Sequence, residues 1–75
     1  MAEWVEVAVL CRSHFTYAQE PLAILWPGGG REEVEEVLEC WLAPGARCFR
    51  VRTERQTLQL SYYEHSDRWE ARALP

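Results

Sequence analysis

The chain contains no lysine, and its eight positively charged residues are all arginine. Twelve acidic residues outnumber them, so the net charge is −4. Proteins that bind nucleic acids or anionic membranes without sequence preference usually carry the opposite balance. The charge therefore disfavours nucleic acid as the principal partner and argues against binding to a membrane surface.

Cysteines and long apolar runs are also scarce. Cys11, Cys40 and Cys48 are an odd set without a closely spaced pair, which argues against the disulfide framework of a small secreted domain. The most apolar stretch near the start, 5–11, is too short for a membrane span and has a glutamate in its middle. Reduced thiols and the lack of an export or membrane segment predict a cytoplasmic protein.

Motifs that carry catalysis are missing too. The glycines of Pro27–Gly30 lack the Lys-Ser/Thr of a phosphate loop and the spacing of a dinucleotide loop, so they predict a chain reversal. There is no nucleophile elbow and no Cys-x-x-Cys pair. A cysteine enzyme built on Cys11 or Cys40 has nothing in the sequence to orient a histidine base. We expect no catalytic residues, no cofactor and no enzymatic activity.

What the chain does contain is apolar surface for a core. Hydrophobic residues make up 48% of the sequence and include nine aromatic residues, enough to fold a chain of this length. The four tryptophans are expected in the core or as anchors at strand ends: Trp4, Trp26, Trp41 and Trp69. Without a repeat or linker, residues 1–75 are expected to form one small β-rich domain.

Most of the chain shows the patterns of β-strands. Period-two alternation or a short apolar run predicts strands at 4–11, 22–26, 49–53, 58–62 and 69–73. The run at 22–26 is apolar on both faces and is expected between other strands. Connectors of hairpin length separate the last three segments, at 54–56 and 64–67. Residues 12–20 show no periodicity and predict a turn or long loop.

Segment 31–42 is the ambiguous part of the sequence. Its apolar residues lie at i, i+3, i+4 and i+7: Val34, Val37, Leu38 and Trp41. Glutamates fill the positions between them, and taken alone this pattern indicates an amphipathic helix.

Several short motifs together resemble a family of uncharacterised bacterial proteins. They are Pro21–Trp26, Gly30-Arg31, the spacing Val34-x-x-Val37-Leu38-Glu39-x-Trp41, Phe49–Arg52 and a closing strand at Trp69. The family is a domain of unknown function, common in actinobacteria and often encoded beside Y-family translesion DNA polymerases. The resemblance covers about residues 5–74. It implies an accessory role in DNA-damage tolerance and a strand at 31–42, the return strand of a hairpin.

This sequence departs from the family pattern around that hairpin. It has extra residues at Pro27-Gly28-Gly29 and glutamate pairs where the family carries aromatic residues, and both favour a helix locally. Tertiary pairing commonly overrides local propensity, so we expect the strand. The prediction is an all-β fold, a small SH3-like barrel or bent antiparallel sheet of five or six strands. The alternative is α+β, with a helix at 31–42 packed on the sheet.

Two clusters of side chains contain the residue types that bind metal ions. The acidic one is Glu32, Glu33, Glu35, Glu36 and Glu39. Carboxylate pairs bind hard cations, but a solvated face explains such a run better. Cys11-x-x-His14, with Cys40, Cys48 or His65 as further ligands, has the chemistry of a zinc site but lacks a second close pair. Buried thiols acting as small hydrophobic residues are the simpler interpretation, and no metal is expected.

The local concentration of positive charge is Arg47, Arg50, Arg52 and Arg55. On a strand, Arg50 and Arg52 share one face, where aromatic neighbours would let them bind single-stranded nucleic acid. We prefer cross-strand ion pairs, with Glu54, Glu64 or Glu70 as partners, because the net charge is negative. The candidate interaction surface comprises Arg50, Arg52, Trp41 and Trp69.

The predicted function is a non-catalytic interaction module with a protein partner. Its warrant is an aromatic-rich, acidic small domain without a catalytic constellation. The alternative is a single-stranded nucleic-acid-binding domain that uses the Arg50/Arg52 face.

Overall fold

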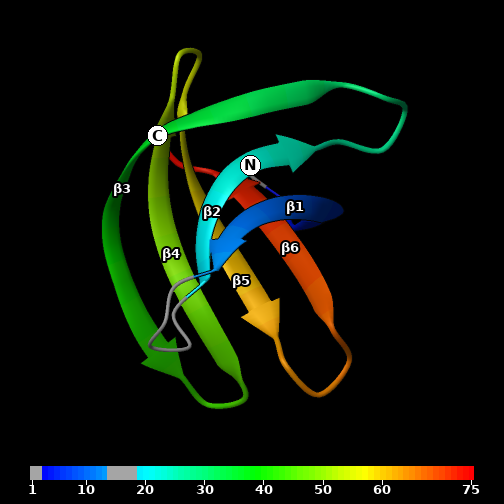
Figure 1. Cartoon of the computed structure of the whole chain (residues 1–75), viewed down its shortest axis with the longest axis vertical. Helices are drawn as coiled ribbons and strands as arrows, with labels where there is room; N and C mark the ends of the chain where they lie inside the picture. Colours follow the sequence, from blue (N-terminus) through cyan, green and yellow to red (C-terminus); the bar gives the residue numbers. More distant parts are fainter. Residues whose placement is uncertain (1–2, 14–18) are drawn as a thin grey trace.

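The computed structural model describes residues 3–13 and 19–75 and contains six β-strands (Figure 1). They are β1 (Val5–Ser13), β2 (Gln19–Leu25), β3 (Arg31–Ala43), β4 (Ala46–Thr53), β5 (Thr57–Tyr63) and β6 (Arg68–Ala73). Each strand pairs antiparallel with the next, and β6 pairs with β1, so the sheet closes into a barrel. The predicted small all-β barrel is confirmed, and the α+β alternative with a helix at 31–42 is wrong. No helix able to cross a membrane occurs in the described part of the chain.

Two strands bend so that the barrel can close. β1 pairs with β6 through Val5–Val7 and with β2 from Ala8 onward. β3 pairs with β2 through Arg31–Glu33 and with β4 from Val34 to Ala43. Each of these strands leaves one neighbour as it joins the next, as strong coiling of a small closed sheet requires.

Two β-bulges explain why β3 has helical spacing in its sequence. Its pairing with β4 shifts register after Val34 and again after Val37. These two valines are three residues apart, so a regular strand would place them on opposite faces. The extra residue Glu35 turns both toward the core, opposite the buried Thr53 and Val51. An apolar spacing of three residues therefore arises here from a bulged strand.

The predicted chain reversal at Pro27–Gly30 connects β2 to β3. The Trp26 amide donates to the Gly30 carbonyl at 2.8 Å, and the Gly29 amide donates to the Trp26 carbonyl at 3.1 Å. Gly28 and Gly29 have φ angles of 94° and 102°, which residues with a Cβ rarely adopt. The glycines are therefore needed for the shape of this turn.

The loop predicted at 12–20 is wrong at both ends. β1 continues to Ser13 and β2 begins at Gln19, because Arg12 pairs with Glu20 and Ser13 with Gln19. Residues 14–18 lie outside the described part. Local composition gave no sign of this pairing, which the hairpin register imposes.

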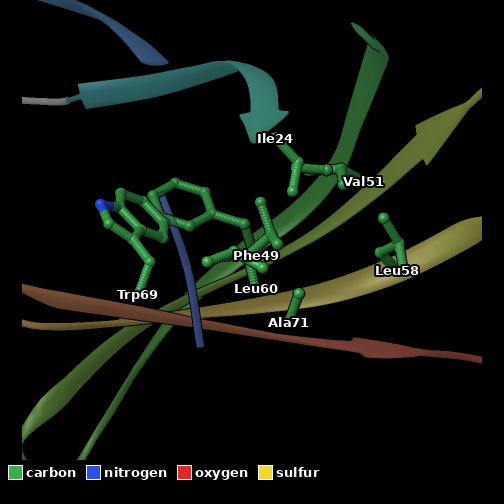
Figure 2. Close-up of a cluster of buried hydrophobic side chains, with 8 residues drawn as sticks. Ile24, Phe49, Val51, Leu58, Leu60, Trp69 and Ala71 are labelled. Carbon is green, nitrogen blue, oxygen red and sulfur yellow. The ribbon is translucent and has the colours of Figure 1, made fainter. Parts of the chain in front are cut away.

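The hydrophobic core fills the barrel (Figure 2), and β3 contributes to it only the half-buried Val34 and Val37. Its buried members are Val7, Ile24, Phe49, Val51, Leu58, Leu60, Trp69 and Ala71. The ring centroids of Phe49 and Trp69 lie 5.7 Å apart, and those of Tyr62 and Trp69 lie 4.8 Å apart. Burying one aliphatic side chain of this kind contributes about 1.5–3 kcal/mol, so the core accounts for much of the stability of so small a domain.

Candidate interaction surface

The second half of β3 has a strand on one side only. β4 pairs with it from Val34 to Ala43, whereas β2 pairs with β3 only at Arg31–Glu33. Within residues 3–13 and 19–75, no other strand pairs with the opposite edge of 35–43. Figure 1 shows this part of β3 curving along the outside of the sheet, beside β4. Such an edge presents backbone donors and acceptors in the geometry that another strand recognises.

Three large apolar side chains are exposed along this edge. Leu38, Trp41 and Leu42 keep 38%, 39% and 76% of their surface accessible. Leu42 pairs with Arg47, on the face of the sheet that carries the core residue Phe49, whereas Trp41 pairs with Cys48 on the other face. We call the free edge of 35–43, with the side chains of Leu38, Cys40, Trp41 and Leu42, the β3 edge surface.

The first bulge also builds an ion-pair cluster. A bulge interrupts the alternation of side chains, so Glu35 and Glu36 both reach Arg52 on β4. The Arg52 Nη1 donates to Glu35 Oε1 at 2.8 Å, and its Nη2 donates to Glu36 Oε1 at 3.1 Å. Arg52 is thereby held between two carboxylates of β3.

Arg50 is also ion-paired with β3. Its Nη2 contacts the carboxylate of Glu39, which lies directly opposite it in the β3–β4 pairing. Ion pairing of these arginines was predicted, with Glu54, Glu64 or Glu70 as partners. For Arg50 and Arg52 those partners are wrong, because β3 supplies the carboxylates. Arg47 does pair with one of them, Glu64, at 3.7 Å. The side chains in the Arg50 and Arg52 pairs are all at least two-fifths exposed, so each of these pairs contributes at most about 1 kcal/mol. Their main effect is to neutralise the arginine face.

The acidic cluster does not lie entirely in solvent as predicted, because Glu32 is buried. Trp26 Nε1 donates to its Oε1 at 3.0 Å, and Thr53 Oγ1 donates to its Oε2 at 2.5 Å. Gln56 Nε2 donates to both oxygens at 3.1 Å. The Thr53 hydroxyl in turn accepts the amide protons of Arg55 and Gln56, at 3.1 Å each. One carboxylate therefore ties the start of β3 to the end of β2 and to the β4–β5 turn.

The hydrogen bonds decide the charge of Glu32. Burial alone raises the pKa of this carboxyl, but the hydrogen bonds from Thr53, Gln56 and Trp26, with the nearby positive charge of Arg55, outweigh it and hold the pKa below its ordinary value. Glu32 is therefore ionised and accepts hydrogen bonds from three side chains, Trp26, Thr53 and Gln56. Such a carboxylate fixes structure and is not poised as a general base at neutral pH.

Two hollows lie near these groups. The larger, about 450 Å³, continues from the end of β3 and is lined by Leu42, Ala43, Gly45, Ala46, Arg47, Glu64 and His65. Arg47 Nη2 lies 3.7 Å from Glu64 Oε1 there. The smaller, about 180 Å³, lies beside the start of β3 and is lined by Arg31, Glu32, Glu33, Glu35, Glu54 and Arg55. The larger hollow extends the β3 edge surface toward the β5–β6 turn.

The cysteines proposed as metal ligands do not converge. Cys40 is exposed on β3 and pairs with Phe49, whereas Cys48 is buried on the other face and its Sγ lies 3.7 Å from Ser61 Oγ. Burial raises the pKa of the Cys11 thiol, which keeps it protonated and weakly nucleophilic. His14, the predicted companion of Cys11, lies outside the described residues. In the part of the chain that the structure describes, no three His, Cys, Asp or Glu side chains are grouped to hold a metal ion.

The four residues predicted as an interaction surface separate into three places. Trp41 belongs to the β3 edge surface, and Arg50 and Arg52 are ion-paired beside it. Trp69 is 8% exposed and belongs to the core, so its inclusion in the surface is wrong. Its ring lies against the rings of Tyr62 on β5 and Phe49 on β4. The alternation along 69–73 indicated this inward position.

The sequence missed Leu38 and Leu42 as surface residues. Leu38 belongs to the apolar pattern of segment 31–42 and Leu42 was not singled out, because the sequence alone does not show where the barrel stops covering β3. The available signal was that apolar residues continue to Leu42 with no partner segment of matching length before them. Leu38 and Leu42 are exposed because β3 continues to Ala43, whereas its pairing with β2 ends at Glu33.

Compared with known proteins, the chain matches no family model, no curated protein and no solved structure. The resemblance to the short bacterial family therefore stays a prediction. Evidence on function comes from the geometry of the chain itself, and above all from β3.

Proposed function

We propose that this chain is a non-catalytic interaction module and that it binds a protein partner through the β3 edge surface. The observation that carries the proposal is an unpaired strand edge flanked by Leu38, Trp41 and Leu42, all exposed. Proteins usually protect such edges with charged side chains, proline, β-bulges or a covering segment. The glutamates and the two bulges protect the edge as far as Glu39, but residues 40–43 pair regularly with β4 and carry neither a charge nor a proline. An edge of this kind with exposed apolar side chains is typical of a surface that is covered in a complex.

The arginine face supports protein binding better than nucleic-acid binding. A phosphate backbone requires free positive charge, and its binding weakens with salt as counterions return. Here Arg50 and Arg52 already hold Glu39, Glu35 and Glu36. A phosphate would have to displace three carboxylates of the same sheet. We therefore do not propose the single-strand alternative.

The proposal also includes the cellular location of the protein and the process in which it acts. A cytoplasmic bacterial protein is supported by its three free thiols and by the family resemblance. A role beside DNA-damage tolerance and the use of the barrel as an SH3-like adaptor are supported by that resemblance alone.

Photocrosslinking in the native host tests the function. A photoreactive amino acid is placed at position 42, in the β3 edge surface, or at position 54, which is exposed in the β4–β5 turn at the other end of β4. We expect a discrete adduct from position 42 and none from position 54. Adducts from both positions, or from neither, would contradict the proposal. The mass of the adduct separates another protein from a second 8.8 kDa chain.

A further inference from the structure

The free edge of β3 is complementary to itself. We infer that a second copy of this chain occupies the β3 edge surface, with the two β3 strands antiparallel and Cys40 on the twofold axis. This inference rests on the proposed function and names the partner. A twofold contact uses the same patch on both copies, so the patch must satisfy itself.

The register is found by aligning the sequence of β3 antiparallel to the same sequence in the second copy. With Cys40 facing Cys40 of the second copy, Leu42 comes opposite Leu38 and Leu38 opposite Leu42. Regular alternation runs from Glu39 to Ala43, so Cys40 and Leu42 of both copies lie on one side of the joined sheet. Leu38, the extra residue of the second bulge, lies at the end of this apolar contact. Glu39 faces Trp41 in the same register. No glutamate then faces a glutamate.

Neighbouring registers are worse. Placing Glu39 on the axis sets two like charges directly opposite each other, which destabilises an antiparallel pair. Placing Trp41 on the axis makes Leu38 face Pro44, which has no amide proton to donate and interrupts the pairing within the exposed apolar stretch. In the Cys40 register Pro44 comes opposite Glu36, outside that stretch. The Cys40 register is thus the one that matches apolar residues over the exposed stretch.

Charge favours a second copy over a basic peptide. The glutamates that would attract a basic partner are Glu35, Glu36 and Glu39, and they already hold Arg50 and Arg52. Three carboxylates against two guanidinium groups leave one net negative charge per surface. Repulsion between two such surfaces is small, although the whole chain carries −4. The surface offers apolar contact and backbone pairing instead of charge.

One strand pair and a short apolar contact make a small interface. Contacts below about 1,200 Å² are generally weak and transient, so we expect a dissociation constant in roughly the micromolar range. Facing α-carbons in antiparallel strands lie about 4.5–5.5 Å apart, which falls within the span that a disulfide bridges, about 4.4–6.8 Å. Cys40 is exposed, so it reports on the contact without further engineering.

Disulfide trapping with the full chain tests the inference. A mild oxidant, copper–phenanthroline, takes two electrons and two protons from a pair of thiols, and a non-reducing gel shows the covalent dimer. We expect a dimer from wild type and from Cys11→Ser, and loss of the dimer in Cys40→Ser. Leu42→Glu, at a side chain 76% exposed, should lower trapping at least tenfold and shift sedimentation equilibrium to the monomer.

A mixing experiment tests the register. In the Cys40→Ser background, Leu38→Cys and Leu42→Cys should each fail to cross-link alone and should cross-link when mixed, because 38 faces 42 of the second copy. Cross-linking of either variant alone at the same rate would overturn the register. A wild-type chain that stays monomeric at millimolar concentration would overturn the self-pairing.

The two proposals fail in different ways. A monomeric chain whose position 42 captures a different protein in the host would end the self-pairing and leave the interaction function standing. A monomeric chain that captures nothing through position 42 would end both.

Discussion

Replacing Glu32 tests whether one buried carboxylate fastens the end of the barrel. Glu32→Ala removes the acceptor shared by Trp26 Nε1, Thr53 Oγ1 and Gln56 Nε2. A buried donor left without a partner costs about 1–3 kcal/mol, but Trp26 and Gln56 are half-buried and can regain water. The Thr53 hydroxyl retains an acceptor in the Gln56 carbonyl, 3.2 Å away. We therefore expect a loss of about 1–3 kcal/mol, which comes from the hydrogen bonds to the charged carboxylate. A domain of this length has about 4–11 kcal/mol in total, so this loss is a large part of its stability.

Urea denaturation followed by tryptophan fluorescence measures this loss. Glu33→Ala is the matched control, because Glu33 is the exposed neighbour and its removal should change the free energy of unfolding by about 0.5 kcal/mol or less. Glu32→Gln keeps one acceptor oxygen and should fall between the two. A Glu32→Ala variant as stable as Glu33→Ala would refute the role assigned to this carboxylate.

The same carboxylate predicts a dependence of stability on pH. The pKa of Glu32 in the folded chain lies below its ordinary value of 4.5, so the folded state favours the ionised form. Its contribution is complete above pH 4.5 and is lost as the pH falls through the lower, folded-state pKa. Between these limits wild type should lose more stability than Glu32→Gln. Parallel curves for the two proteins in that acidic window would contradict the assignment.

Three further substitutions probe other parts of the barrel by their free energy of unfolding. Leu58→Ala empties a fully buried core position and should cost about 2–5 kcal/mol; a smaller loss would mean that the core collapses into the space. Gly45→Ala has open space for its Cβ but a φ of 75°, so strain alone should cost about 1 kcal/mol, and no loss at all would contradict that backbone. Arg52→Ala breaks exposed ion pairs and should cost under about 1 kcal/mol. Wild type should not bind a single-stranded oligonucleotide at low salt; salt-sensitive binding that Arg52→Ala abolishes would contradict the neutralised arginine face.

The strands that alternate regularly could be predicted from the sequence. Residues 49–53, 58–62 and 69–73 have period-two patterns, and each became a strand with its apolar side in the core. Their partners are neighbours in the chain, joined by short turns, so local information was sufficient.

β3 could not be read locally, because its pattern depends on what it pairs with. The bulge at Glu35 converts a spacing of three residues into two inward-facing valines, Val34 and Val37. The sequence also offered no reason to expect that Glu32 is buried while the glutamates beside it are exposed. The side chains that donate hydrogen bonds to it, Trp26, Thr53 and Gln56, lie in other segments of the chain. Trp41 was predicted as a surface residue, but Leu38 and Leu42 were missed for the same reason, because the exposure of Leu42 depends on where β2 stops.

Amide hydrogen exchange along β3, measured by NMR at increasing protein concentration, tests the central claim most directly. In dilute solution, alternate amides of 39–43 should exchange rapidly because they face the free edge, while the amides between them are protected by β4. As concentration rises, or as a host partner is added, protection should appear at the fast amides and not at exposed turns such as 64–67. Uniform protection of 39–43 in the dilute chain, or fast exchange that no concentration or partner slows, would contradict a binding edge on β3.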